Sequence, residues 1–154
     1  MLGAGLFAAS LAALAIWCAI LLLPWQPHRT RERIEPAGAP AADLRCLTVL
    51  IPARNEAAVL ERTLLALARQ GEGLRIVVVD DQSTDGTAEL VRRCAAATPQ
   101  LALSVVPGAP LPPGWAGKLW APEQGRAHAD RPYTLLLDAD IELAPGLSSA
   151  LLDL

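Results

Sequence analysis

Lysine is almost missing from this 154-residue chain, which holds Lys118 alone against 12 arginines. Basic and acidic side chains number 13 and 16, so the formal net charge is -3 at pH 7. Nucleic acid is therefore not expected as a partner, because phosphate backbones are bound by strongly basic faces. The length allows one ordinary domain with a short appendage.

Motifs for several common sites are also missing. The three cysteines form no C-x-x-C pair, which excludes a disulfide framework or a zinc site on this pattern. His28 and His128 have no metal-ligand spacing. No G-x-G-x-x-G follows the first predicted strand, which argues against a dinucleotide site. The segment "GWAGKL" (114–119) lacks the first glycine and the final hydroxyl of a phosphate-binding P-loop.

Charge is absent from Leu2–Leu23, which holds much of the chain's 53% hydrophobic content. As a helix this stretch would span about 33 Å, enough for a bilayer core. A cleaved signal peptide is the alternative, but no basic residue precedes the run. The basic residues Arg29, Arg31 and Arg33 follow it, which predicts a cytoplasmic C-terminal side at the inner membrane. We expect a membrane helix over 1–25 and a Pro-rich linker over 26–45.

From residue 46 onward, apolar strands alternate with helical patterns. We expect strands over 47–51, 76–79, 101–106 and 133–137, and helices over 56–70, 83–97 and 119–129. Asn55 is the expected cap of the first helix and Gly71 its end, and Ser83 or Thr84 is the expected cap of the second. Near-continuous apolar strands between helices predict an α/β layer with a mainly parallel sheet.

Polar residues follow three of the predicted strands, as "PARNE" (52–56), "DDQSTDGT" (80–87) and "DADIE" (138–142). Parallel sheets bind ligands beyond the carboxyl ends of their strands. Helix capping explains Ser83, Thr84 and Asp85, but it requires no acid at the strand end itself. We therefore interpret Asp80 and Asp81 as acceptors for a ligand N–H or hydroxyl.

The alternating acids of "DADIE" end a buried, leucine-rich strand. Buried carboxylates are costly unless they are paired or bound to a cation. Oxygen ligands of this kind suit Mg²⁺ or Mn²⁺, which also bind substrate phosphates. A solvated acidic loop is the alternative. Lys118 is an ammonium suited to phosphate, although chance retention of one lysine explains it equally well.

Taken together, these motifs resemble those of family 2 glycosyltransferases with the GT-A fold. The resemblance covers residues 46–154 and is carried by "VLIPARNEA" (49–57), "VVVDDQSTDGT" (77–87) and "LLLDADIEL" (135–143). The loop "PLPPGWAGKLWA" (110–121), with the apolar N-terminal stretch, is most similar to the hopene-associated glycosyltransferases of hopanoid biosynthesis.

The resemblance implies a Rossmann-like nucleotide-diphospho-sugar transferase layer. It implies inverting transfer of a sugar from a nucleotide-diphospho-sugar, expected to be a UDP-sugar, to a lipid or hydrophobic acceptor. The implied nucleotide-sugar-binding residues are Pro52, Arg54, Glu56, Asp80, Asp81, Lys118 and Asp138. Among them, Asp81 is expected to bind the base and Asp80 to support the loop. The implied Mg²⁺ or Mn²⁺ site has Asp140 as the main ligand, with Asp138 and Glu142 in its shell.

The resemblance also places the general base well downstream of the "DAD" acids, so that group is expected beyond Leu154. The chain is then either part of a longer enzyme or a membrane-tethered nucleotide-sugar-binding module without catalysis. A response-regulator receiver also has a strand ending in two aspartates. It is disfavoured because it needs a later lysine, and none follows Asp138.

Overall fold

The computed structural model describes residues 2–22, 34–36 and 42–153. The chain forms two compact units, Met1–Arg33 and Ile34–Leu154. Most of the predicted linker 26–45, including the arginines at 29, 31 and 33, lies outside the described residues. The last part of that predicted linker contains the two-residue strand β1 (Ala42–Asp43).

In the first unit, α1 (Leu2–Leu22) is a single apolar helix without charged residues. It is the one helix among the described residues that is long and apolar enough to cross a membrane, with a mean hydropathy of 2.3 over Gly5–Leu22. None of that window is buried against protein. The predicted apolar helix is therefore present.

The second unit is built on a four-stranded, all-parallel sheet in the order β5-β4-β2-β6. Its strands are β2 (Leu47–Ala53), β4 (Arg75–Asp80), β5 (Ala102–Pro107) and β6 (Tyr133–Leu136). A two-residue parallel pair joins β1 to β3 (Gly71–Glu72). The predicted α/β layer with a parallel sheet is confirmed.

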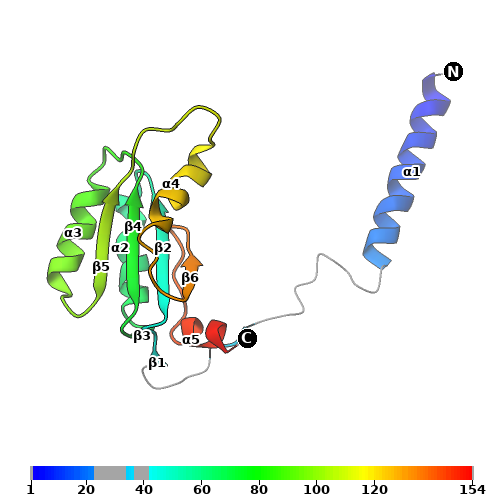
Figure 1. Cartoon of the computed structure of the whole chain (residues 1–154). Helices are drawn as coiled ribbons and strands as arrows, with labels where there is room; N and C mark the ends of the chain where they lie inside the picture. Colours follow the sequence, from blue (N-terminus) through cyan, green and yellow to red (C-terminus); the bar gives the residue numbers. More distant parts are fainter. Residues whose placement is uncertain (1, 23–33, 37–41, 154) are drawn as a thin grey trace. The chain divides into compact units, whose positions relative to one another are not determined.

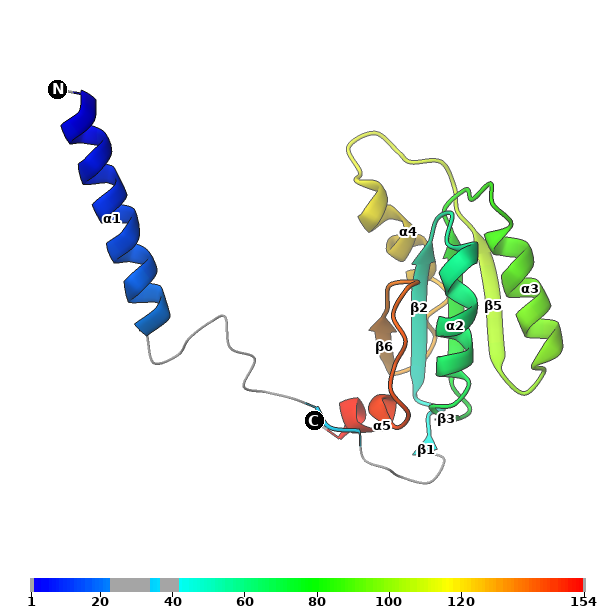
Figure 2. The same ribbon diagram turned by 180° about the vertical axis from the view of Figure 1, so that it is seen from behind.

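Helices cover both faces of this sheet, as Figures 1 and 2 show from opposite sides. On one face, α2 (Ala57–Leu67) and α3 (Thr87–Ala97) pack against Val49, Ile51 and Ile76. On the other face, α4 (Gly117–Arg126) places Ala121 against Leu50 and Val77. Alternate strand residues thus point into two different cores, which explains why β2 and β4 are apolar along almost their whole length.

The strand register aligns the carboxyl ends of the central strands. Ala53 lies opposite Asp80, and Asp80 lies opposite Pro107. The loops that follow β2, β4 and β5 therefore begin at one edge of the sheet, the upper edge in Figure 1.

Several predicted helix ends differ from the structure. The N-cap positions of α2 and α3 are Glu56 and Gly86, and neither makes a side-chain cap hydrogen bond, so the caps predicted at Asn55 and at Ser83 or Thr84 were wrong. Gly71 was predicted to end the first helix, but α2 ends four residues earlier, at Leu67. Gly71 instead begins β3. The helix α5 (Leu147–Leu152) was not predicted.

Candidate functional site

A pocket of about 310 Å³ lies at the carboxyl ends of β2 and β6 and against α4. Its size is within the range of small-molecule sites. Eleven residues line it: Pro52, Ala53, Arg54, Glu56, Asp81, Gly117, Lys118, Ala121, Pro122, Leu136 and Asp138. Six of the seven residues that the family resemblance implied for nucleotide-sugar binding are in this set.

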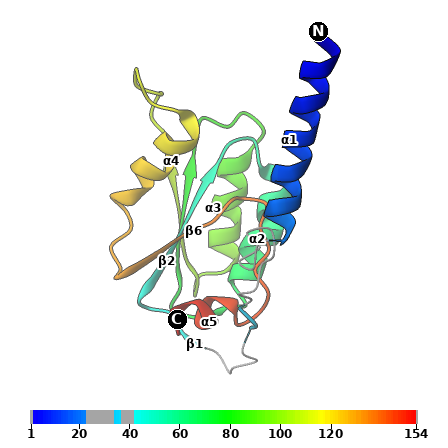
Figure 3. The same ribbon diagram turned by 90° about the vertical axis from the view of Figure 1, so that its right-hand side faces the viewer.

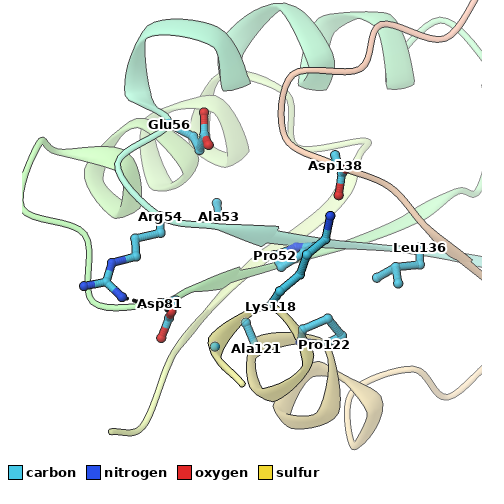
Figure 4. A pocket seen from close by; sticks show the side chains of 11 residues that line it. Pro52, Ala53, Arg54, Glu56, Asp81, Lys118, Ala121, Pro122, Leu136 and Asp138 are labelled. Carbon is cyan, nitrogen blue, oxygen red and sulfur yellow. Dashed lines mark ion pairs between the residues drawn. The ribbon is translucent and has the colours of Figure 1, made fainter. Parts of the chain in front are cut away.

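One end of the pocket is formed by the loops after β2 and β4. Arg54 and Asp81 face each other there, with a guanidinium-to-carboxylate distance of 3.6 Å, drawn as a dashed line in Figure 4. The Asp81 side chain is 13% exposed, whereas that of Arg54 is 65% exposed. The Asp81 N–H donates to the Ala53 carbonyl at 2.8 Å, which fixes the aspartate at the strand end. A shielded acceptor in this position can take a ligand N–H.

Asp80 is the predicted binding residue that does not line the pocket. Its carbonyl accepts hydrogen bonds from the N–H groups of Gln82 and Gly108, both at 2.8 Å. Its carboxylate accepts from the Ser83 N–H at 3.3 Å. A Cβ at Gly108 would lie 2.9 Å from that carbonyl oxygen, so the close approach requires glycine. Asp80 therefore supports the loop that carries Asp81.

The same two loops are joined by Asn55, which lies in the left-handed region with φ 57°. Its N–H donates to the Ser83 hydroxyl at 2.9 Å, and its side-chain oxygen accepts from the Thr84 N–H at 2.8 Å. Asn55 does not cap α2 because its side chain is already bonded to a loop 29 residues away.

Asp85 adds a second connection between these loops. Its carboxylate accepts from the Ala57 N–H at 3.0 Å and from the Thr87 N–H at 3.0 Å and hydroxyl at 2.6 Å. The Thr87 hydroxyl also accepts from the Glu56 N–H at 3.0 Å. The hydrogen bond from Thr87, followed by those from backbone N–H groups, lowers the pKa of Asp85. We call the hydrogen bonds of Asn55, Asp85 and Thr87 across the two loops the loop clamp.

The other end of the pocket carries Lys118 and Asp138. Lys118 lies in the first turn of α4, because this helix begins at Gly117 rather than at the predicted residue 119. Figure 4 shows its ammonium directed toward the side of the pocket where Asp138 lies. Pro52, Ala121 and Leu136 supply apolar surface to the pocket.

The "DAD" segment turns directly after β6. The Ile141 N–H donates to the Asp138 carbonyl at 3.3 Å, so the extended alternation of acids stops there. Ala139 is 4% exposed, and its carbonyl accepts from the buried Thr63 hydroxyl at 2.7 Å. The residue between the two acids is thus fixed against α2, while Asp138 and Asp140 are exposed on either side of it.

The three predicted metal ligands do not gather at one point. Asp138 lines the pocket, Asp140 does not, and Glu142 lies 3.5 Å from Arg62. Within residues 2–22, 34–36 and 42–153, no three His, Cys, Asp or Glu side chains form a metal-binding group. The exposed carboxylates of Asp138 and Asp140 nevertheless fit an ion held by one or two acids, water and ligand phosphates, as Mg²⁺ commonly is. These two carboxylates do not fit a metal site in which protein side chains supply all the ligands.

The sequence analysis did not identify the loop clamp or five of the pocket residues, which are Ala53, Gly117, Ala121, Pro122 and Leu136. Gly117, Ala121 and Pro122 line the pocket because they share a helix with Lys118. Helical spacing from Lys118 was the signal for Ala121 and Pro122. The clamp had no comparable signal, since its partners lie 28 to 31 residues apart.

Comparison with known proteins gives a consistent result. Residues 48–154 match Glycosyl transferase family 2. The 4,4'-diaponeurosporenoate glycosyltransferase of Staphylococcus haemolyticus is 32% identical over 97 residues, which is 63% of this chain and 24% of that protein. The validoxylamine A glucosyltransferase of Streptomyces hygroscopicus subsp. limoneus is 40% identical over 79 residues, which is 45% of this chain and 17% of that protein.

Among solved structures, the mannosyltransferase PcManGT from Pyrobaculum calidifontis, in complex with GDP-Man and Mn²⁺, is similar with a TM-score of 0.59 and 31% identity. The similarity covers 97% of this chain and 40% of that one. The chain thus spans about a quarter or less of these curated relatives and under half of this solved structure.

Proposed function

Because the chain belongs to glycosyl transferase family 2, we propose that its α/β unit binds the nucleotide-diphosphate portion of a sugar donor. The observation that carries this proposal is the two-ended pocket, with Asp81 at one end and Lys118 and Asp138 at the other. A nucleoside diphosphate needs both a hydrogen-bond acceptor for its base and a cation for its phosphates.

In this proposal Pro52, Arg54 and Glu56 line the base pocket and Asp81 accepts a hydrogen bond from the base. Lys118 binds the diphosphate, and Asp138 faces the ribose or the metal shell.

Asp138 and Asp140 would hold a Mg²⁺ or Mn²⁺ that neutralises charge on the diphosphate. Glu142 contributes only when it leaves Arg62. PcManGT, which was solved with GDP-Man and Mn²⁺, supports the pairing of nucleotide sugar and divalent ion.

Calorimetric titration of the full chain with UDP, GDP, UMP and ADP in the presence of Mn²⁺ tests donor binding. We expect binding of a nucleoside diphosphate, with UDP preferred. Asp81→Ala should weaken it by about 1–3 kcal/mol even without metal, because a donor on the base loses its acceptor. Asp130→Ala, which removes an exposed acid outside the pocket, is the control. No binding of any of the four nucleotides by a folded chain contradicts the proposal.

We also propose that α1 anchors the protein in the inner membrane, with the α/β unit in the cytoplasm. The hydropathy of Gly5–Leu22, in which no residue is buried, supports this, together with the arginines that follow α1 in the sequence. Reporter fusions after residue 40 should show cytoplasmic signal. Periplasmic signal, or a mature chain that begins near residue 25, contradicts the anchor.

We propose inverting transfer of the sugar to a lipid or hydrophobic acceptor, with a hopanoid-related compound as the specific candidate. The named relatives act on 4,4'-diaponeurosporenoate and on validoxylamine A, so the acceptor is not common to the family. The support is α1 and the Pro-rich loop. Membranes carrying the protein should transfer labelled sugar to solvent-extractable lipid. Donor binding without such transfer favours a non-catalytic binding module.

A further inference from the structure

The segment Pro107–Leu119, here called the apolar loop, runs from the last residue of β5 into the first turn of α4. It extends beyond the carboxyl edge of the sheet (Figures 1 and 3). It holds three large hydrophobic side chains that face solvent, Leu111 at 51%, Trp115 at 43% and Leu119 at 64% exposure. Three such side chains close together on one projecting segment make it a candidate interaction surface.

Hydrogen bonds hold the apolar loop in shape without covering these side chains. The Trp120 indole N–H donates to the Ala109 carbonyl at 3.0 Å, and the Gln124 side-chain oxygen accepts from the Ala109 N–H. Trp115 packs edge-on against Trp120, with ring centroids 5.1 Å apart. In the part of the chain that the structure describes, the Trp115 indole N–H has no protein acceptor. An apolar ring with an unused polar edge suits a lipid–water interface.

The charge of the segment also suits a membrane surface. Between Pro107 and Pro122 the sequence contains no acidic residue, and its one charged residue is Lys118. Anionic headgroups would therefore meet a weak positive charge and no repelling carboxylate.

The chain itself brings a bilayer within reach. Residues 23–46 separate α1 from β2, and an extended chain of this length spans at most on the order of 80 Å. Tethering of this kind raises the local concentration of bilayer around the α/β unit, so a weak surface contact becomes populated.

We propose that the apolar loop docks into the headgroup layer of the bilayer, with Leu111, Trp115 and Leu119 inserted. This inference rests on the proposed membrane anchor and is independent of the proposed donor binding. Docking places the side of the pocket that carries Lys118 next to the lipid surface. A hydrophobic acceptor would then approach the pocket without leaving the membrane.

The test uses the full chain with Trp17→Phe and Trp25→Phe, reconstituted into phosphatidylcholine and phosphatidylglycerol vesicles with or without acyl-brominated lipid. Bromine quenches tryptophan only at close range. Trp115→Phe in the same background reports Trp120 alone, so the difference between the two gives the Trp115 signal. We expect brominated lipid to reduce that signal about twofold, as for a side chain at interfacial depth.

The double variant Leu111→Ser/Leu119→Ser should lose most of this quenching. Leu65→Ser, which changes a leucine of 50% exposure on α2, should keep it. Vesicle flotation and UDP titration are run on every variant. A chain that floats but shows no Trp115 quenching overturns the loop proposal and leaves the anchor intact. A chain that does not float overturns both. If Trp115 emission is not quenched but shifts to shorter wavelength as the amount of protein per vesicle rises, the loop contacts a second copy of the chain. That result contradicts lipid docking.

Discussion

The carboxylate of Asp85 accepts a hydrogen bond from the Ala57 N–H at 3.0 Å, which joins the first turn of α2 to the loop that precedes α3. Its other oxygen accepts from the N–H and hydroxyl of Thr87. One side chain thus satisfies free N–H groups at the start of two helices. Through the loop clamp it also fixes the two loops that carry Arg54 and Asp81.

We expect Asp85→Ala to lower the melting temperature by several degrees and Asp85→Asn by less, because the amide keeps one acceptor oxygen. Thermal unfolding of the full chain in lipid nanodiscs measures this. Glu89→Ala is the control, since it removes an exposed acid whose one ion pair within the described residues is with Arg92 in the same helix. An unchanged melting temperature in Asp85→Ala at pH 7 contradicts the clamp.

The pH dependence of this effect has a defined sign. The pKa of Asp85 is lowered in the folded state from its ordinary value of 3.8. Its ionised form therefore stabilises the fold above that value, and the contribution is lost as the pH falls through the lower, folded-state pKa. The difference in melting temperature between the parent and Asp85→Ala should be constant near neutrality and shrink only below about pH 4.

The buried threonines Thr63 and Thr48 give a matched pair of substitutions to valine. The Thr63 hydroxyl donates to the Ala139 carbonyl, whereas the Thr48 hydroxyl has no partner among the described residues. Thr63→Val should cost about 1–3 kcal/mol of stability, because a buried carbonyl loses its donor. Thr48→Val should be neutral or stabilise by about 1 kcal/mol, because it removes an unsatisfied buried hydroxyl.

Equilibrium unfolding of the two variants checks this pair. Hydrogen exchange at the Ile141 N–H, which closes the acidic turn, should also accelerate in Thr63→Val and not in Thr48→Val. Equal effects of the two substitutions would show that the Thr63 contact does not hold the turn.

The sequence predicted the sheet because the sheet follows from local pattern, whereas the individual pocket residues were implied by the family resemblance. Apolar strands give the parallel layer, and polar residues at strand ends identify the edge where Arg54, Asp81 and Asp138 converge. Sequence pattern did not predict the side-chain contacts whose partners are distant in the chain. Asn55 has the composition of a helix cap, yet its side chain binds the Thr84 N–H.

The acids of "DADIE" show the same limit. Alternation along an extended strand would set all three acids on one side. Thr63 on α2 and Gln70 in the turn that follows α2 instead hold the chain on a different path after Leu137. Gln70 donates to the carbonyls of Leu143 and Ala144 and accepts from the Ser148 N–H. The direction of these acids therefore depends on contacts with residues more than 70 positions earlier in the chain. Sequence periodicity does not reveal such contacts.

Gly125 sets the distance between α4 and the sheet. A Cβ at this position would overlap Leu50 Cδ1 and lie 2.8 Å from Val79 Cγ2. Gly125→Ala should therefore destabilise the fold by about 1–3 kcal/mol and push α4 outward. Because Lys118 is on this helix, nucleotide affinity should fall as well.

Gly117→Ala is the matched control for stability in the same helix, since a Cβ there meets nothing within 4 Å. Its stability should be unchanged or slightly higher. Thermal unfolding of both variants tests the packing of α4, and UDP titration is made on Gly125→Ala alone, because Gly117 lines the pocket. A Gly125→Ala chain as stable as the parent would mean that α4 does not pack at the described distance.

Divalent ions should raise the affinity of the chain for nucleoside diphosphate through Asp140 and Asp138. The two carboxylates are exposed on either side of the buried Ala139, and neither has a hydrogen-bond or ion-pair partner among the described residues. Diphosphate oxygens would complete the ion's coordination, so metal and nucleotide should bind cooperatively. Titrations with UDP in Mn²⁺, in Mg²⁺ and in excess EDTA measure this coupling.

Asp140→Ala should abolish the metal dependence while metal-free affinity stays close to that of the parent, because Asp140 does not line the pocket. Asp138→Ala should lower affinity in both conditions, since its carboxylate lines the pocket. Glu142→Ala should reduce the coupling only slightly, because Arg62 lies 3.5 Å from that carboxylate and competes with an ion for it. Equal affinity of the parent in EDTA and in Mn²⁺ would remove the metal role from these acids and leave them as a solvated turn.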